Sequence, residues 1–157
     1  MKKYLQNKKL VIYGVSGILF IGLCIILFCD RKVTCTFESK QDNHVINAKY
    51  IIKYKNGYVK KVKINQIVTT DEKSIIDKYN KQFEKQYSSN KKYYGGYDYK
   101  ITIKDDSISS NVVINYKKFD MNKFIKNNEA MKQYTKDGKF TIEGAKKMYE
   151  ASGAICK

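Results

Sequence analysis

The chain has 157 residues, and its 31 lysine and arginine residues outnumber 15 acidic residues, so the formal net charge is +16. A chain of this length forms one domain with a modest core once a membrane segment is set aside. The charge raises nucleic acid, anionic lipid or an acidic polymer as partners. Only Arg31 is an arginine, and Pro and Trp are absent. This composition argues against recognition of phosphate through bidentate guanidinium groups, and an AT-rich genome would also explain the lysines.

The first thirty residues predict a membrane anchor. Residues 10–28 read LVIYGVSGILFIGLCIILF without a charge, and about 20 apolar residues suffice to cross a bilayer as a helix. The run is longer than the apolar stretch of a cleavable signal peptide, and no small-x-small cleavage site follows it. We therefore expect a cytoplasmic basic segment at 1–9, a transmembrane signal anchor in the lipid bilayer at 10–29, and an extracytoplasmic domain at 30–157.

The charges around this run support that orientation. Lys2, Lys3, Lys8 and Lys9 precede the run, and the positive-inside rule places such a cluster in the cytoplasm. The expected location is thus the cell membrane, with a single pass and an outward-facing C-terminal domain.

Cys29 invites comparison with the lipidated cysteine of bacterial lipoproteins, which follows a small residue. Phe28 precedes Cys29, and Leu23 precedes Cys24, so neither context favours that lipidation. Another acylation of Cys29 and an inert thiol at the membrane boundary both remain open. Cys24 reads as a small apolar residue of the span.

Residues 43–68, NHVINAKYIIKYKNGYVKKVKINQIV, predict a β-hairpin around Asn56-Gly57. A regular two-residue loop would place Lys61 and Lys63 opposite Ile52 and Tyr50, on the apolar face. A three-residue loop of residues 55–57 instead pairs Tyr50 with Val62 and keeps the apolar faces together. We predict the three-residue loop. We also expect the short segment DRKVT, which follows the membrane span, to be a tether between the span and the folded domain.

Residues 69–87 then change to a helical period. Thr70 or Asp71 can cap this helix, and one apolar stripe runs along it: Ile75, Ile76, Tyr79, Phe83 and Tyr87. We interpret the stripe as a face that packs on the core.

The rest of the chain predicts a second hairpin and two helices. Asp105-Asp106 forms the turn of the hairpin and places Tyr99 opposite Val112. Asp120 begins a helix with a weaker apolar stripe, and a last helix runs from Thr141 to Gly153. Strands, a helix, strands and two helices predict an α+β fold, an antiparallel β-sheet of hairpins with amphipathic helices on one face.

The other two cysteines predict a disulfide. Cys35 lies near the start of the outer domain and Cys156 is the penultimate residue. A terminal segment frays unless it is tied down, and the extracytoplasmic location would allow such a bond to persist. The alternative is two unrelated free thiols.

Several segments together resemble a known family. They are YIIKYKNGYVKKVKI, YGGYDYKITIKDDSISSNVVINYKKFD and AKKMYEASGAICK. In these the chain resembles the YehR-like family of small, uncharacterised Gram-positive lipoproteins and their membrane-anchored relatives. The resemblance covers residues 33–157 and implies an extracytoplasmic α+β domain, but none of its segments is a catalytic motif.

No pattern in the sequence predicts an enzyme, a cofactor or a metal site. His44 is a single histidine without a partner at metal-ligand spacing. Gly95-Gly96 does not lie between a strand and a helix as a phosphate loop does. Asp105-Asp106 is explained as a turn.

A surface site remains as a candidate. In SSNKKYYGGYDY, which we expect to be a loop, two lysines lie beside three tyrosines: Lys91, Lys92, Tyr93, Tyr94 and Tyr97. Such residues can stack on bases and pair with phosphates, or contact an anionic cell-wall polymer, although tyrosines that simply cap the sheet are the plainer explanation. Our first hypothesis is therefore a non-catalytic binding or scaffolding domain at the cell surface. The second is a polyanion-binding module for single-stranded nucleic acid or a wall polymer, which requires lysines clustered on one face.

Overall fold

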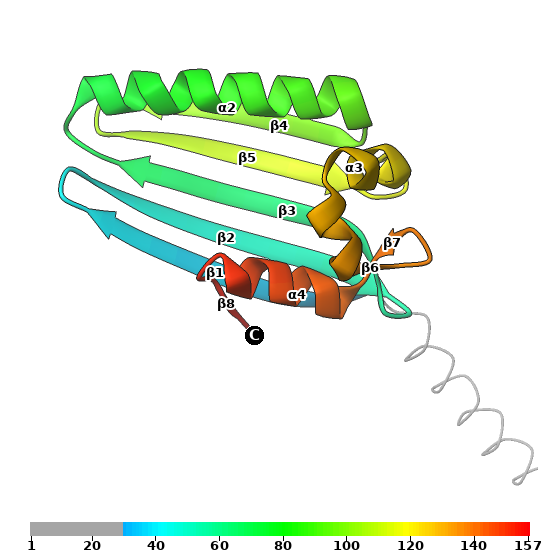
Figure 1. Ribbon diagram of the computed structural model, residues 1–157. Coiled ribbons are helices and arrows are strands. Elements are labelled where there is room, and N and C mark those ends of the chain that lie inside the picture. Colours follow the sequence, from blue (N-terminus) through cyan, green and yellow to red (C-terminus); the bar gives the residue numbers. More distant parts are fainter. Residues whose placement is uncertain (1–29) are drawn as a thin grey trace, which may run out of the picture. The chain divides into compact units, whose positions relative to one another are not determined.

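The computed structural model describes residues 30–157, and the predicted cytoplasmic segment and transmembrane anchor lie outside this range. Residues 31–157 form one compact unit (Figure 1). Within the described residues, no helix has the length and apolar character needed to cross a membrane.

Six antiparallel strands form the main sheet, in the order β4-β5-β3-β2-β1-β8. Their bounds are β1 Arg31–Gln41, β2 His44–Lys55, β3 Tyr58–Thr69, β4 Tyr97–Lys104, β5 Ser107–Asn115 and β8 Ile155–Cys156. The first three strands form a meander, and the chain returns through a long helix to the β4–β5 hairpin, which pairs with β3.

The remaining elements are helices and one small hairpin. They are α2 Lys73–Tyr94, α3 Met121–Asn127, the 3-10 helix η1 Glu129–Tyr134, the strands β6 Thr135–Lys136 and β7 Lys139–Phe140, and α4 Ile142–Ala151. The β6–β7 hairpin turns at Asp137-Gly138, both with positive φ, as a tight two-residue turn requires.

The helices cover one face of the sheet, as predicted. Cross-strand partners point to the same face, and Tyr50 of β2 is opposite both Cys35 and Ile64. The Tyr50 ring packs on Tyr149 of α4 at 4.2 Å between centroids. Tyr99, on the same face of β4, packs on Tyr87 of α2 at 5.6 Å. Figure 1 shows α2 and α4 on this side of the sheet.

The core lies between this face and the helices. Its largest fully buried aliphatic side chains come from the three central strands β2, β3 and β5: Ile52, Val62, Val68, Ile108 and Val112. The predicted stripe of α2 supplies Ile75, Ile76, Phe83 and Tyr87, which confirms it as a core face.

The predicted three-residue loop of the first hairpin is wrong. The turn consists of Asn56 and Gly57, with φ values of 52° and 78°, and a β-bulge follows it. Tyr54 is opposite Val59, and Lys53 is opposite Lys61, so Lys60 is the extra residue. The bulge advances the register by one position and places Val62, not Lys61, opposite Ile52. Tyr50 is therefore opposite Ile64 and not opposite Val62 as predicted.

The second hairpin matches its prediction, with Tyr99 opposite Val112 around the Asp105-Asp106 turn. The caps of the last two helices also match. The backbone N–H of Lys123 donates to the Asp120 side chain at 2.9 Å, and that of Gly144 donates to Thr141 at 3.0 Å.

Two other predictions are corrected. The segment DRKVT is not a tether, because β1 begins at Arg31 and pairs along its whole length with β2. The predicted loop at Lys91–Tyr94 is the last turn of α2. Glycines at 95 and 96, both with positive φ, then end the helix.

Candidate functional site

None of the helices within residues 30–157 lies on the opposite face of the sheet, which we call the open face (Figure 1). It consists of the residues that alternate with the core residues along each strand. One cross-strand row runs through Thr36, Lys49, Asn65, Asn111 and Lys100. The side-chain amide of Asn65 donates to that of Asn111 within this row.

Lysine dominates the charge on the open face. Apart from Lys55, which ends β2 beside the turn, it carries by register eight lysines and two carboxylates: Lys32, Lys40, Lys49, Lys53, Lys61, Lys63, Lys100 and Lys104, with Glu38 and Asp98. All are exposed except Lys61, which is half-buried. By comparison, residues 71–94 carry six lysines with four acids, and residues 117–151 carry nine lysines with five. The positive charge is therefore least compensated on the open face.

Both open-face carboxylates are already engaged. Lys40 Nζ lies 3.1 Å from Glu38 Oε1, and Lys91 Nζ lies 3.6 Å from Asp98 Oδ1. The other seven open-face lysines form no ion pair with a described residue. They remain available to an external anion.

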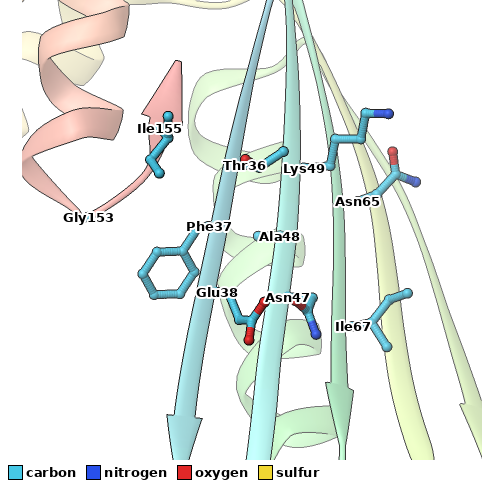
Figure 2. Close-up of a pocket in the computed structure, with 10 residues that line it drawn as sticks. All are labelled: Thr36, Phe37, Glu38, Asn47, Ala48, Lys49, Asn65, Ile67, Gly153 and Ile155. Atoms are coloured by element: carbon cyan, nitrogen blue, oxygen red, sulfur yellow. The ribbon is translucent and has the colours of Figure 1, made fainter. Parts of the chain in front are cut away.

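A shallow hollow of about 580 Å³ lies where the open face meets the β1 edge (Figure 2). Polar side chains from three strands line it, namely Thr36, Glu38, Asn47, Lys49 and Asn65, and Glu38 is the one paired with Lys40. Ile67 and Ile155, which are 45% and 65% exposed, also line it. The hollow therefore combines hydrogen-bonding groups, one unpaired cation and two exposed apolar side chains.

The predicted lysine–tyrosine site is only partly assembled on the surface. Lys91, Lys92 and Tyr93 are exposed on the last turn of α2, and Lys123 Nζ lies 5.5 Å from the centre of the Tyr93 ring. Tyr94 and Tyr97 instead pack on Phe119, at 5.6 and 5.8 Å. Burial, above all, raises the pKa of Tyr97 to about 12. The three tyrosines thus do not form one exposed stacking surface.

Other tyrosine hydroxyls are buried between the helices and the sheet. Burial is the main cause that raises the pKa of Tyr50, Tyr87, Tyr116 and Tyr149. The Tyr87 hydroxyl also forms a 3.1 Å hydrogen bond with that of Ser110. These groups stay neutral and belong to the core of the covered face.

His44 lies at the start of β2, where its Nε2 is 3.0 Å from the Tyr79 hydroxyl of α2 and its Nδ1 is 2.9 Å from Asn43 Oδ1. Both ring nitrogens therefore have a protein partner. Among residues 30–157, no group of three His, Cys, Asp or Glu side chains could hold a metal ion.

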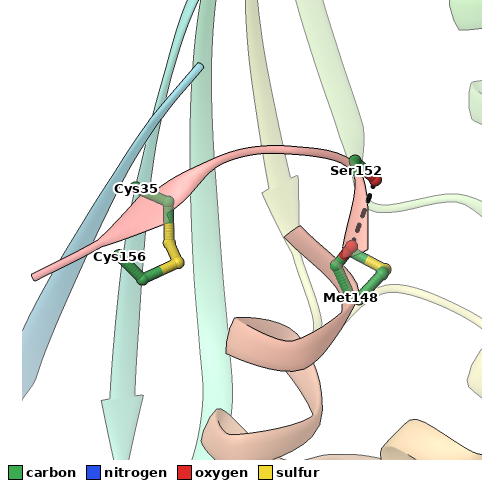
Figure 3. Close-up of a disulfide and its surroundings, with 4 residues drawn as sticks. All are labelled: Cys35, Met148, Ser152 and Cys156. Carbon is green, nitrogen blue, oxygen red and sulfur yellow. Dashed lines mark hydrogen bonds between the residues drawn. A yellow bond between two sulfur atoms is a disulfide. The ribbon is translucent and has the colours of Figure 1, made fainter. Parts of the chain in front are cut away.

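The predicted disulfide joins Cys35 and Cys156 (Figure 3). The two residues are cross-strand partners on β1 and β8. The backbones of Thr34 and Lys157 exchange two hydrogen bonds beside them, of 2.9 and 2.8 Å. The C-terminus is thus held on the edge of the sheet, next to the hollow.

The open-face lysines were not predicted as a group from the sequence. A signal was present, because Lys61 and Lys63, and likewise Lys100 and Lys104, alternate with apolar residues along strands. That alternation places them on one face of a strand. Which strands lie side by side depends on the sheet order, which the sequence did not predict.

No family model matches the sequence, and no functionally curated protein matches it. Two solved structures are similar. The solution NMR structure of the Escherichia coli YehR protein aligns with a TM-score of 0.53 and 18% sequence identity, over 81% of this chain and 91% of that chain. The NMR structure of a protein from Streptococcus pneumoniae TIGR4 aligns with a TM-score of 0.51 and 14% identity, over 82% of this chain and 86% of that chain. At these identities the likeness concerns the fold alone, and the described domain has a YehR-like α+β fold.

Proposed function

We propose that the chain is a membrane-anchored, extracytoplasmic and non-catalytic domain that binds an anionic cell-surface polymer on the open face of its sheet. The observation that carries the proposal is the charge on that face, where seven lysines have no ion-pair partner among the described residues. A polymer that neutralises several lysines releases its counterions, which favours binding.

The polymer is expected to be a phosphate-rich chain without bases. Proteins that hold single-stranded nucleic acid usually combine cations with exposed aromatic rings on which bases stack. Among the described strands, the register places one aromatic residue on the open face, Tyr58 beside the first turn. Its hydroxyl donates to Asp137 and its ring lies 5.5 Å from Lys139 Nζ, so it is already engaged. The tyrosines of β2 and β4 point instead to the covered face, where Tyr50 and Tyr99 contact the helices.

The membrane anchor and the outward orientation rest on the uncharged run at 10–28 and on the lysines before it. Protease added to intact cells should remove the domain at 30–157 and leave the N-terminal segment in the membrane. A domain that resists the protease until the cells are opened would contradict this orientation.

Polymer binding can be tested with the full chain in lipid nanodiscs that contain only zwitterionic lipid. The probe is polyglycerol phosphate, and the open-face variant replaces Lys49, Lys100 and Lys104 with Gln. A matched control replaces Lys78, Lys81 and Lys85, which are exposed at helical spacing on α2. Both variants remove three charges.

We expect the open-face variant to bind the polymer at least tenfold more weakly at low salt, and the α2 variant to bind much as the wild type does. Equal losses in the two variants would mean that binding follows net charge alone and would refute a site on the open face. A second titration with single-stranded DNA should show no tighter binding per phosphate, because the cross-strand rows that contain Lys49, Lys100 and Lys104 hold no aromatic ring for stacking.

A further inference from the structure

Four open-face lysines gather at one end of the sheet, and we call them the lysine quartet. Lys32, Lys53 and Lys61 are direct cross-strand partners on β1, β2 and β3. Lys63 lies two residues beyond Lys61 on the same face. Neighbouring strands are about 4.8 Å apart, so this row of three spans about 10 Å.

The quartet is electrostatically unfavourable without a ligand. Like charges directly opposite each other destabilise a strand pair, and this row contains two such pairs, Lys32 with Lys53 and Lys53 with Lys61. None of the quartet forms an ion pair with a described residue. An anion that contacts several of these lysines would relieve the repulsion.

The place of the quartet in the chain indicates which anion is near. The uncharged run ends at Phe28, four residues before Lys32. A fully extended chain covers at most about 14 Å over four residues. If the run enters a bilayer, Lys32 therefore lies within that distance of the membrane boundary, and Lys53 and Lys61 follow on the neighbouring strands.

We propose that the lysine quartet binds the phosphate groups of anionic phospholipids in the membrane that holds the anchor, and so keeps this end of the sheet against the bilayer surface. The inference rests on the proposed membrane anchor and names the lipid headgroup as the anion at this end of the open face. Lys49, Lys100 and Lys104 then remain for the polymer.

The chemistry of the quartet fits a lipid surface better than a single bound phosphate. The quartet consists of flexible ammonium groups, which act as point charges. Guanidinium groups, by contrast, bind one phosphate through two parallel hydrogen bonds. Three of its members are exposed. None of the four lines the hollow near the β1 edge, or a second hollow of about 210 Å³ that Tyr58, Tyr116 and Phe140 line. Each lysine close to an anionic membrane strengthens attachment by about fivefold.

The test uses the full chain in two kinds of nanodisc, with zwitterionic lipid only or with anionic phosphatidylglycerol added, and without polymer. Brief acetylation followed by mass spectrometry reports the accessibility of each lysine. We expect the quartet to react several-fold more slowly in the anionic discs. The exposed lysines of α2, Lys78, Lys81 and Lys85, should react equally in both.

Two double variants on the same face sharpen the test. Replacing Lys53 and Lys61 with Gln should abolish most of the protection of Lys32 and Lys63, because two contacts of about fivefold each are lost. Replacing Lys100 and Lys104 with Gln should leave that protection unchanged. Salt at about 1 M, where the Debye length is about 3 Å, should remove it.

Equal reactivity of the quartet in the two discs would overturn the inference while leaving polymer binding, measured in zwitterionic discs, intact. A chain that does not co-purify with either disc would overturn the anchor and this inference together. Loss of polymer binding with retained lipid protection would refute only the proposed polymer site.

Discussion

Cys35 and Cys156 lie opposite each other on β1 and β8, 121 residues apart in sequence, with their Cα atoms 4.0 Å apart. The bond fastens the last residues of the chain to the strand that begins the domain. Cys35 is also fully buried, on the face of the sheet that the helices cover. One covalent link thus closes nearly the whole domain into a loop.

Replacing both cysteines with Ser should destabilise the domain by about 2–5 kcal/mol, because the open chain gains conformational entropy when it unfolds. Chemical denaturation of the oxidised wild type and the double variant would measure this difference. Amide exchange should also accelerate at Ile155 and Lys157, whose strand contains few other bonds. Unchanged exchange there would show that hydrogen bonding to β1 alone holds the C-terminus.

Tyr87 and Ser110 provide a second stability test, since their hydroxyls bond each other where Ser110 is 1% exposed. Tyr87→Phe should cost about 1–3 kcal/mol, because the Ser110 hydroxyl loses its partner in the core. The matched control is Tyr99→Phe, which removes the 3.1 Å bond to Glu84 near the surface and should cost well under 1 kcal/mol because water can replace the partner. Equal costs would contradict the burial of this pair.

Substitutions at two glycines with positive φ can distinguish the cost of backbone strain from the cost of a steric clash. Gly57 has φ of 78° and open space around an added Cβ, whereas Gly96 has φ of 66° and would place a Cβ 2.7 Å from the Asn115 carbonyl oxygen. Gly57→Ala should therefore cost about 1 kcal/mol through strain alone. Gly96→Ala should cost clearly more, since backbone must move, and thermal unfolding of the two variants would rank them. The reverse order would refute the close approach of Gly96 to the end of β5.

Because several tyrosines are buried, we expect the folded domain to lose stability at alkaline pH. The pKa of Tyr97 is raised to about 12 from the ordinary value of 10.0, chiefly by burial. Below pH 10 the folded and unfolded states both keep its proton. Between pH 10 and about 12 only the unfolded state loses the proton, so folding stability falls across that interval.

The phenolate absorbance of the folded protein should accordingly appear at higher pH than that of the protein in concentrated guanidinium. A folded-state titration that coincides with the unfolded one would show that water reaches these hydroxyls.

The sequence predicted those parts of the fold that depend on short-range pattern. Turn chemistry at Asp105-Asp106 and the spacing of Ile75, Ile76, Phe83 and Tyr87 needed only neighbouring residues. The disulfide was also predicted, because a terminal segment frays unless a bond holds it and Cys156 lies in such a segment. The YehR-like resemblance agrees with the fold of a solved structure.

The missed features depend on long-range contacts or on irregular backbone. The alternation of apolar and polar residues cannot distinguish a bulge at Lys60 from a longer loop, because both arrangements keep Val62 on the core face. The open face of strand β1 carries polar residues, and β1 pairs with β8 from the other end of the chain. The open-face lysines become one surface only when the sheet order brings their strands together.

The salt dependence of binding tests most directly whether the open face binds an anionic polymer. The logarithm of the affinity of the full chain for polyglycerol phosphate should fall linearly with the logarithm of salt concentration, by about 0.7–0.9 for each lysine that contacts a phosphate. Replacing Lys49, Lys100 and Lys104 with Gln should reduce this slope by about 2, whereas replacing Lys78, Lys81 and Lys85 should leave it unchanged. Equal slopes in both variants, or no binding at low salt, would contradict the account.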